Sequence, residues 1–570
     1  MALYDFIVVG SGPAGSALAS SISRTSAKPS VLLLEAGGKN SDPNLRVDGK
    51  RWLTFTNEEM NWGFKTAPQE HCDGRSIDYS GGRGLGGSSA INFGVYTIGA
   101  WDDYDEWARV TGNDTAFGWN AMQKRFKQLE NFSKKRPAHV AEKFAKPDMA
   151  NHGTDGLLNV GFSAEWEDDV VPMLEVFEKG GFPINPDHNS GDPIGMSALI
   201  SSARNGKRST AQDLYADKPE NLTIITCQKV RKLILEGRKV VGVETKDAKY
   251  HASKEVIISA GALNSPAILM HSGIGPKSQL EKHNIPVVLD VSAVGQGLRD
   301  HNFCPLVYSR SETSTARKAF YGDQKAMDAA LEQWKQDGTG PWSKFACQAG
   351  IGFFKLPALP SHPAFRALPA SEQALLQKPT VPHYEVFTHF PMHWFLHQFP
   401  PEKLNYSCLL VFLYNAQARG EVTLQSADPE VPLRFDPRVL SEAFDRTAAV
   451  MALRDVLDRV VRSADYQKDT LGGLAAPAGD SDEELLAYWK KTISSSWHMT
   501  GTLKMGPAGG APDAVVDPEF RVVGIEGLRV ADMSVAPVLI SGHIQAAAYA
   551  TGLTCAEKVA QQHGLNAGLS

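Results

Sequence analysis

A strand that runs directly into a glycine-rich turn occupies the first fifteen residues of the chain. The apolar segment 4–9 is followed by Gly10-Ser-Gly12-Pro-Ala-Gly15, and a helix is predicted from about Ala14 to Arg24. In such a turn Gly10 permits the tight bend, Gly12 lets the backbone approach a pyrophosphate, and Gly15 lets the helix pack close to the strand. The helix would point its N-terminal amides at the phosphates. The chain is therefore predicted to begin with a dinucleotide-binding unit.

A second apolar segment followed by an acid extends this unit. Residues 30–34 are predicted to form a strand that ends at Glu35, twenty residues after Gly15. A carboxylate at this distance can accept hydrogen bonds from a ribose diol, and Ala36 beside it is assigned to the same site. Strand, turn, helix, strand and acid in this order predict an α/β fold with a Rossmann-like domain.

Composition limits the classes of partner. The chain has 570 residues, 42% of them hydrophobic, and a net charge of −6, with no lysine–arginine stripe suited to nucleic acid. No apolar run reaches the ~18 residues of a membrane span. No secretory leader precedes the first strand, so an intracellular, cytoplasmic location is expected. The six cysteines are scattered, without the spacing of a zinc site or a disulfide scaffold.

Later segments repeat the pattern of strand and glycine. Four short strands are predicted between 222 and 258, and the last leads into Gly261 and a helix. A dense glycine block at 81–92 permits close approach of the backbone to a ligand. These features predict one sheet assembled from distant segments. The predicted domains are a discontinuous cofactor domain of residues 1–150, 200–301 and 491–570, and a second domain of residues 151–199 and 302–490.

The second domain has a different character. Residues 302–490 contain proline-rich connections and an aromatic, histidine-rich stretch. A helix is predicted over 443–464 and a glycine–alanine–proline loop over 471–479. Ser481 and Glu484 have the spacing of a capping box at the start of the next helix.

Two histidines near the C-terminus are candidates for proton transfer. His498 and His543 lie among small residues on either side of a predicted strand that ends at Asp532. Neutral imidazole accepts a proton near neutral pH and so serves as a general base. The pattern alone leaves two readings open, a catalytic pair or two hydrogen-bonded structural histidines.

Three further histidines share a spacing of four residues. His389, His393 and His397 would lie on one face of a helix, but Pro391 interrupts it, and no carboxylate or cysteine clusters beside them. No metal site is therefore predicted. The stretch is interpreted as an aromatic wall or lid of the substrate pocket.

Several separated motifs, taken in order, resemble one known family. The chain is similar to the glucose–methanol–choline (GMC) family of FAD-dependent oxidoreductases, and within it to aryl-alcohol and hydroxymethylfurfural oxidases. The motifs that carry the resemblance are Gly82–Asn92 (GRGLGGSSAIN), Gly261–Gly275 (with GA, SP, IL and SGIG), the turn with Gly295, Asp300 and His301, the His498-x-x-Gly-Thr segment and Ser541-Gly542-His543.

The resemblance implies FAD in a discontinuous Rossmann-like domain, with an antiparallel sheet of an α+β substrate domain over the flavin. Members with covalently attached FAD have a histidine at the position of Ile91, so the cofactor is predicted to be non-covalent. By motif position the implied cofactor-binding residues are Gly10, Gly12, Gly15, Glu35 and Ala36 at the ADP half, Val230 near the adenine, Asp532 near the pyrophosphate or ribityl chain, and Ser88, Asn92, Val95, His543 and Gln545 near the flavin.

The implied reaction is oxidation of a primary alcohol to the aldehyde. His498 would remove the hydroxyl proton while hydride passes to flavin N5, and His543 would orient the substrate oxygen and stabilise alkoxide character. Aromatic side chains are expected in the pocket and would favour an aromatic or furanic alcohol: Phe93, Trp497, Phe390 and Trp394. The chain departs from the family at Tyr96-Thr-Ile-Gly99, where many members have Tyr-x-Arg-Gly, so the substrate class is open at this point.

Other functions remain open on the same residues. A hydroxynitrile lyase or a sugar dehydrogenase has similar histidines on this scaffold, and a non-catalytic flavin protein is a third reading. The electron acceptor is O₂ or another molecule.

Overall fold

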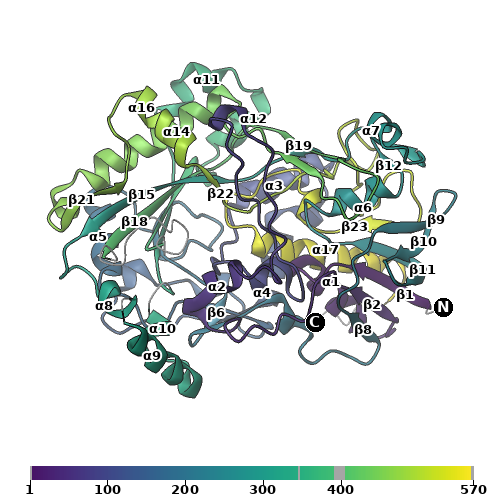
Figure 1. Cartoon of the computed structure of the whole chain (residues 1–570), viewed down its shortest axis with the longest axis horizontal. Helices are drawn as coiled ribbons and strands as arrows, with labels where there is room; N and C mark the ends of the chain where they lie inside the picture. The colour runs from purple at the N-terminus through teal and green to yellow at the C-terminus, as the bar shows by residue number, and fades with distance from the viewer. Residues whose placement is uncertain (1–2, 322, 345–346, 391–404, 566–570) are drawn as a thin grey trace.

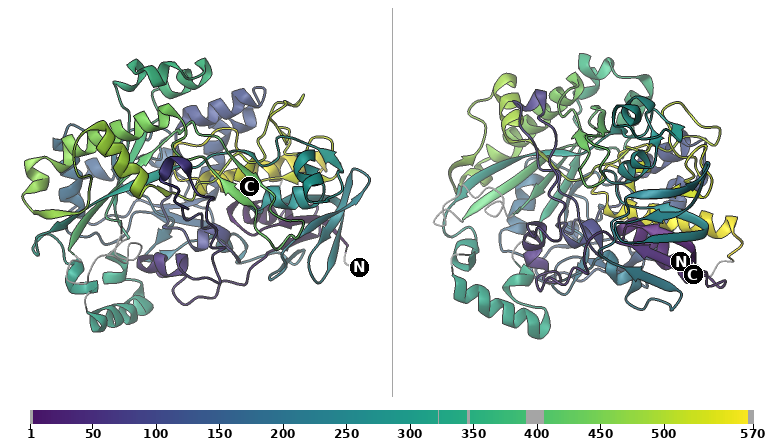
Figure 2. Two further views of the ribbon diagram at one scale, coloured as in Figure 1. Left: turned by 45° about the horizontal axis from the view of Figure 1, so that its top comes forward. Right: turned by 45° about the vertical axis from the view of Figure 1, so that its right-hand side comes forward.

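The computed structural model describes residues 3–321, 323–344, 347–390 and 405–565. Two large sheets lie toward opposite ends of its long axis, and Figures 1 and 2 show them from three directions. One sheet carries the N-terminal strand. The other is built mainly from residues between 302 and 475, together with two shorter pieces of chain.

The first sheet gathers strands from three distant parts of the chain. Its order is β8-β2-β1-β11-β10-β9, and β23 also pairs with β11. β1 is parallel to both β2 and β11, whereas β11, β10 and β9 are antiparallel. The strands are β1 (Leu3–Val9), β2 (Val31–Leu34), β8 (Leu222–Ile225), β9 (Lys232–Glu236), β10 (Lys239–Glu244), β11 (Lys249–Ile258) and β23 (Leu528–Val530). The predicted Rossmann-like sheet from separate segments is confirmed.

Two helices from the two ends of the chain pack together beside this sheet. α1 (Pro13–Ser23) follows the glycine turn, and α17 (Gln545–Gln562) lies alongside it (Figure 1). A Cβ at Gly552 of α17 would lie 2.1 Å from the carbonyl oxygen of Ala14. Only glycine permits this approach, so the C-terminal helix fixes the position of the N-terminal one.

The second sheet is antiparallel, with order β21-β15-β18-β17-β16-β5, and β22 also pairs with β15. Its two faces have different neighbours. Phe387, Leu410 and Phe412 belong to an aromatic cluster on one face, whereas Val386 and Val411 belong to the main core. The strands are β5 (Gly195–Ala198), β15 (Asn302–Arg310), β16 (Gly350–Phe354), β17 (Tyr384–Thr388), β18 (Tyr406–Leu413), β21 (Thr470–Ala475) and β22 (Ser494–Ser495).

Smaller elements connect the two sheets. A three-stranded sheet has β14 (Gln296–Leu298), β19 (Gly420–Thr423) and β20 (Arg434–Asp436), and short pairs join β3 (Glu130–Ser133) to β4 (Leu158–Gly161), β6 (Ala203–Arg204) to β7 (Lys207–Arg208) and β12 (Ile274–Gly275) to β13 (Leu289–Asp290). The remaining α-helices are α2 (Arg51–Phe55), α3 (Trp101–Val110), α4 (Trp119–Leu129), α5 (Val170–Lys179), α6 (Ser265–His271), α7 (Lys277–Lys282), α8 (Arg317–Tyr321), α9 (Gln324–Asp337), α10 (Pro341–Lys344), α11 (Pro363–Arg366), α12 (Ala370–Gln377), α14 (Ala443–Val456), α15 (Ala464–Gln467) and α16 (Asp482–Thr492). None of the helices within the described ranges is both long and apolar enough to cross a bilayer.

Of three local predictions from the sequence, the structure confirms one and corrects the other two. The capping box of α16 is confirmed, because Glu484 N donates to Ser481 Oγ and Ser481 N donates to the Glu484 carboxylate. The loop predicted over 471–479 is wrong in its first half, where β21 pairs with β15 as an edge strand. The helix predicted over 443–464 is α-helical only to Val456 and widens into a π-helical turn at Leu457–Val461.

The proposed domain boundaries stay a prediction. β22 lies within the segment 491–570 that was assigned to the cofactor domain, yet it pairs with β15 of the antiparallel sheet. The chain therefore returns to the second sheet once more before it completes the first.

Candidate active site

The three glycines of the first turn have different surroundings. A Cβ at Gly10, whose φ is +100°, would lie 2.4 Å from the Ser259 carbonyl oxygen, and one at Gly15 would lie 2.0 Å from the Gly10 carbonyl oxygen. A Cβ at Gly12 would meet no atom within 4 Å. Gly10 and Gly15 are therefore required by the packing of the protein itself, whereas Gly12 borders open space at the N-terminus of α1.

Glu35 has a role in the fold that the motif did not predict. Its Oε2 accepts hydrogen bonds from the Ser11 amide (3.0 Å) and hydroxyl (2.7 Å). Its Oε1 accepts from the amides of Gly37 and Gly84, both at 2.9 Å. This buried carboxylate ties the first turn to the glycine block 81–92. Its contact with a ribose stays a prediction.

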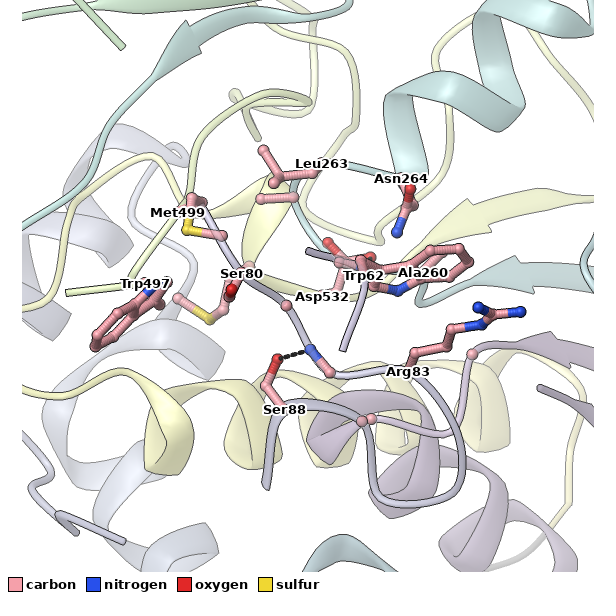
Figure 3. A pocket seen from close by; sticks show the side chains of 18 of the residues that line it. Trp62, Ser80, Arg83, Ser88, Ala260, Leu263, Asn264, Trp497, Met499 and Asp532 are labelled. Atoms are coloured by element: carbon pink, nitrogen blue, oxygen red, sulfur yellow. Dashed lines mark hydrogen bonds between the residues drawn. The ribbon is translucent and has the colours of Figure 1, made fainter. Parts of the chain in front are cut away.

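A cavity of about 540 Å³ extends from the first turn to the two histidines. Figure 3 shows part of it, with Asp532 and Ser88 on its walls. It brings together almost all of the predicted site residues: Gly10, Gly12, Glu35, Ala36, Ser88, Asn92, Phe93, Val95, Val230, Phe390, Trp497, His498, Asp532, His543 and Gln545. Gly15 packs behind the turn, and Trp394 lies outside the described residues.

The cavity fits an extended dinucleotide. No side chain caps the N-terminus of α1, so its first amides remain for an anionic ligand beside Gly12. At the adjoining strand end Asp532 accepts hydrogen bonds from the Gly261 amide (2.9 Å) and the Ser534 amide (2.7 Å), and burial raises its pKa. Ser88 Oγ accepts from the Gly82 amide at 3.1 Å (Figure 3).

Hydrogen bonds lock the residues predicted to lie near the flavin. Asn92 Nδ2 donates to Gln545 Oε1 (3.1 Å), and Gln545 Nε2 donates to the Val95 carbonyl oxygen (2.7 Å). Ile91 is buried in an apolar cluster and also lines the cavity. Its aliphatic side chain cannot form the bond that a histidine makes to covalently attached FAD.

His498 and His543 come together at one end of the cavity. Their ring centroids are 4.7 Å apart and the ring planes are nearly perpendicular, at 80°. The His498 amide donates to Asp300 Oδ1 at 2.8 Å. Burial and the neighbouring His543 and His301 lower the pKa of His498 well below its usual value. The ring is therefore neutral at pH 7, which is the form that accepts a proton.

His301 determines which nitrogen of His498 is left for chemistry. The Nδ1 atoms of the two rings are 3.0 Å apart, so one of them carries the shared hydrogen. His301 is fully buried and its ring stacks on Tyr414 with centroids 4.0 Å apart. The Nε2 atom of His498 is the one that remains for the cavity. The sequence marked His301 only as part of a family motif.

His543 has a partner that sequence reasoning missed. Its Nε2 lies 3.0 Å from Glu385 Oε1, and its amide donates to Thr97 Oγ1 at 2.6 Å. Tyr414 Oη donates to the other oxygen of Glu385. Glu385 is the one charged residue in the buried strand β17, and that isolated acid is the signal that could have identified it.

Aromatic side chains form the wall beside the histidines. The ring of Phe93 lies 5.2 Å from Phe390 and 6.0 Å from Trp497, centroid to centroid. Trp497 adopts a left-handed backbone conformation with φ of 59°, and its Nε1 donates to Asp78 Oδ1 at 2.7 Å. Three of the four predicted pocket aromatics are thus adjacent to one another.

The histidine-rich stretch can be described only in part. His389 Nε2 lies 3.3 Å from Asp169 Oδ1, whereas His393 and His397 fall outside the described residues. The described part of the chain contains no group of three or more His, Cys, Asp or Glu side chains arranged to hold a metal ion. The expectation of no metal stays a prediction.

Comparison with known protein families shows to which family the chain belongs. Residues 4–303 match the N-terminal model of the GMC oxidoreductases, and residues 416–552 match the C-terminal model. The chain belongs to the GMC oxidoreductase family. The resemblance inferred from the motifs is confirmed, and with it an FAD-dependent enzyme that acts on CH–OH donors.

GMC relatives extend over nearly the whole chain. A pyranose dehydrogenase 3 from Leucoagaricus meleagris is 31% identical over 96% of this chain and 91% of its own length. An alcohol dehydrogenase [acceptor] from Pseudomonas putida is 30% identical over 95% of this chain and 93% of its own.

Solved GMC structures share the fold. A formate oxidase from Aspergillus oryzae superposes with a TM-score of 0.87 and 26% identity, covering 99% of both chains. A fungal aryl-alcohol oxidase gives a TM-score of 0.84 and 25% identity, covering 98% of this chain and 99% of its own.

The open space at Gly12 allows binding to be tested apart from folding. We expect Gly12→Val to purify folded but with about a tenth or less of the wild-type FAD, because the added side chain, whose Cβ meets no protein atom within 4 Å, occupies the space of the pyrophosphate. Absorbance of the flavin relative to protein measures the content, and far-UV circular dichroism measures folding. Gly38→Val is the matched control, since Gly38 also borders open space but does not line the cavity. Full FAD content in Gly12→Val would contradict the assignment.

Proposed function

We propose that this GMC oxidoreductase oxidises a primary alcohol with an aromatic or furanic substituent to its aldehyde, with non-covalently bound FAD. The observation that carries the proposal is a neutral, buried His498 whose free Nε2 adjoins an aromatic wall. The similarity to a fungal aryl-alcohol oxidase supports this substrate class. O₂ or another acceptor reoxidises the cofactor.

The protein residues divide the work between proton transfer and positioning. His498 Nε2 accepts the hydroxyl proton in the tautomer in which His498 Nδ1 donates to His301 Nδ1, and this contact holds the ring in one orientation. His543, fixed by Glu385 and Thr97, positions the substrate oxygen. The residues from Gly10 to Glu35 and from Ser88 to Val95 would hold FAD, which would supply the hydride acceptor when bound.

The walls around the histidines favour an aromatic substituent over a sugar. Phe303 and Phe412 continue the aromatic wall formed by Phe93, Phe390 and Trp497. A planar ring can pack edge-to-face or stacked against such side chains. A sugar would instead leave several hydroxyls without hydrogen-bond partners there, which costs binding free energy. The relationship to a pyranose dehydrogenase makes a sugar the alternative to be tested.

Anaerobic mixing with a panel of alcohols tests the substrate class. We expect benzylic and furanic primary alcohols to bleach the flavin absorbance faster than aliphatic alcohols or sugars at equal concentration. Fastest bleaching by a sugar would overturn the proposal in favour of a sugar dehydrogenase. Cyanide release from a cyanohydrin without bleaching would favour a lyase. Admission of air then reports whether O₂ reoxidises the cofactor.

Replacement of His498 tests the base. His498→Ala should slow flavin reduction by the alcohol about 10²–10⁴-fold with FAD content unchanged, because general-base catalysis is worth that factor. Since burial lowers the pKa of His498 below 6.5, the neutral base is present throughout pH 7–8, and loss of rate through this group appears only at more acid pH. Stopped-flow reduction between pH 5 and 8 measures both. The exposed His362, replaced by alanine, is the control. An unchanged rate in His498→Ala would remove it from the mechanism.

The side chain of Ile91 predicts the mode of FAD attachment. Acid precipitation of the holoenzyme should leave all of the yellow colour in the supernatant, because an aliphatic side chain offers no nucleophile to the flavin. Absorbance of pellet and supernatant is the measurement. Colour retained in the washed pellet would show covalent attachment through another residue.

A further inference from the structure

Two buried arginines lie behind the loop 90–95 that faces the cavity. Arg51 on α2 and Arg208 on β7 are 4% and 2% exposed. Arg51 Nη1 donates to Asn92 Oδ1 at 3.1 Å. Arg208 donates to the backbone carbonyl oxygens of Ala90 and Asn92. Both guanidinium groups therefore hold Asn92, one by its side chain and the other by its main chain.

The negative charge close to Arg51 and Arg208 does not neutralise the two positive charges of these side chains. Asp48 pairs with Arg51, with Oδ1 2.5 Å from Nε. Arg208 forms no ion pair with any described residue, and its donors go to the neutral oxygens of Thr54, Ala90 and Asn92. Guanidinium groups stay protonated in proteins. The cluster of Arg51, Arg208 and Asp48, called here the arginine pair, thus carries one net positive charge out of contact with solvent.

The loop is shaped to press against this charge. A Cβ at Gly94, whose φ is +77°, would lie 2.2 Å from Cζ of Arg51. Only glycine lets the main chain lie against the guanidinium plane. Gly94 itself lines the cavity, so at this position a single residue separates the Arg51 cation from the cavity.

The Arg51 cation also fixes the direction of the hydrogen bonds that run from Asn92 through Gln545 along the cavity wall. Arg51 can only donate, so the Asn92 atom that faces it is the carbonyl oxygen. Asn92 Nδ2 then donates to Gln545 Oε1, and Gln545 Nε2 donates to the Val95 carbonyl oxygen. Arg51 thereby directs the NH₂ group of the Asn92 side chain away from itself and along the cavity wall. An N–H group polarised by a nearby cation is a stronger donor to negative charge.

Alcohol oxidation creates negative charge in this cavity. Conversion of R–CH₂OH to R–CHO releases one proton and one hydride. His498 would take the proton, and FAD, when bound beside Asn92, would supply the hydride acceptor and so take up the negative charge. Burial lowers the pKa of both His498 and His301 well below the usual value, so the proton that His498 takes up is weakly held and neither ring keeps a lasting positive charge.

We propose that the arginine pair is an electrostatic positioning device that stabilises the reduced, anionic cofactor and so raises its reduction potential, with Arg51 acting through Asn92. A preorganised charge behind a dry wall acts more strongly than one in water and needs no rearrangement during the reaction. The proposal requires FAD in the cavity but no particular alcohol. Loss of the preference for aromatic alcohols would leave it intact.

The test is a redox equilibrium measured on the purified holoenzyme, without substrate. Each variant is reduced slowly in the presence of a reference dye, and the ratio of reduced to oxidised flavin is read at a fixed dye ratio. Arg51→Met and Arg208→Met should each lower that ratio at least tenfold. Asp48→Asn should raise it, because it removes the carboxylate that pairs with Arg51 and keeps an oxygen for Arg51 Nε.

The flavin ratio is expected to fall in the arginine variants and to rise in Asp48→Asn, and these opposite directions distinguish an effect of charge from a structural effect. Arg125→Met is the matched control, since Arg125 is equally buried but ion-paired to Glu557 and does not line the cavity. Its ratio should stay at the wild-type value, even if thermal stability falls. If Arg51→Met fails to retain FAD, the ratio of reduced to oxidised flavin in the isosteric variant Asp48→Asn tests the proposal by itself. An unchanged or lowered ratio in Asp48→Asn, or a wild-type ratio in a flavin-loaded Arg51→Met, would overturn the proposal.

Discussion

The hydrogen bonds of one buried carboxylate hold the cofactor half of the molecule together. Glu35 accepts from the amides of Ser11, Gly37 and Gly84, and from the Ser11 hydroxyl. An ionised carboxylate is costly to bury unless such donors replace its water. Because these donors belong to separate segments, satisfying Glu35 also brings the glycine block 81–92 against the first turn. The phosphate end of the cavity exists between those two segments.

The histidine end depends on the other sheet. Glu385 on β17 supports His543, His301 just before β15 supports His498, and Tyr414 just after β18 contacts both supports. Each imidazole therefore has its orientation fixed by a group on or next to a strand of the antiparallel sheet. Supports that are themselves held by strands keep a catalytic pair in register better than loops alone would. The first sheet thus positions the glycine-rich end of the cavity, and the second sheet aligns the two histidines.

The sequence predicts a feature well where the residues that form it lie close together in the chain or belong to a known motif. The first turn was predictable because its glycines serve local backbone geometry: Gly10 has a positive φ, and Gly15 lies against the Gly10 carbonyl oxygen. The two candidate histidines came from motifs, which carry information about partners that are distant in sequence. Glu385 could be marked as an isolated acid in a buried strand, but its partner His543 lies 158 residues away, so the sequence did not indicate what the acid contacts. β21 was missed because Gly472 and Gly473 are typical of a loop, and only the hydrogen bonds offered by β15 make the segment a strand.

The packing of α17 against α1 has a consequence for the order in which this enzyme is made. β1, the turn and α1 are synthesised first, whereas β23 and α17 come from the last 45 residues of the chain. At about 5–20 residues per second, roughly half a minute to two minutes separate the two on the ribosome. Throughout that interval the N-terminal unit lacks the helix that buries one side of it. For most of that interval the growing chain has its glycine-rich turn but neither His498 nor His543, so the two ends of the cavity come together only late in synthesis.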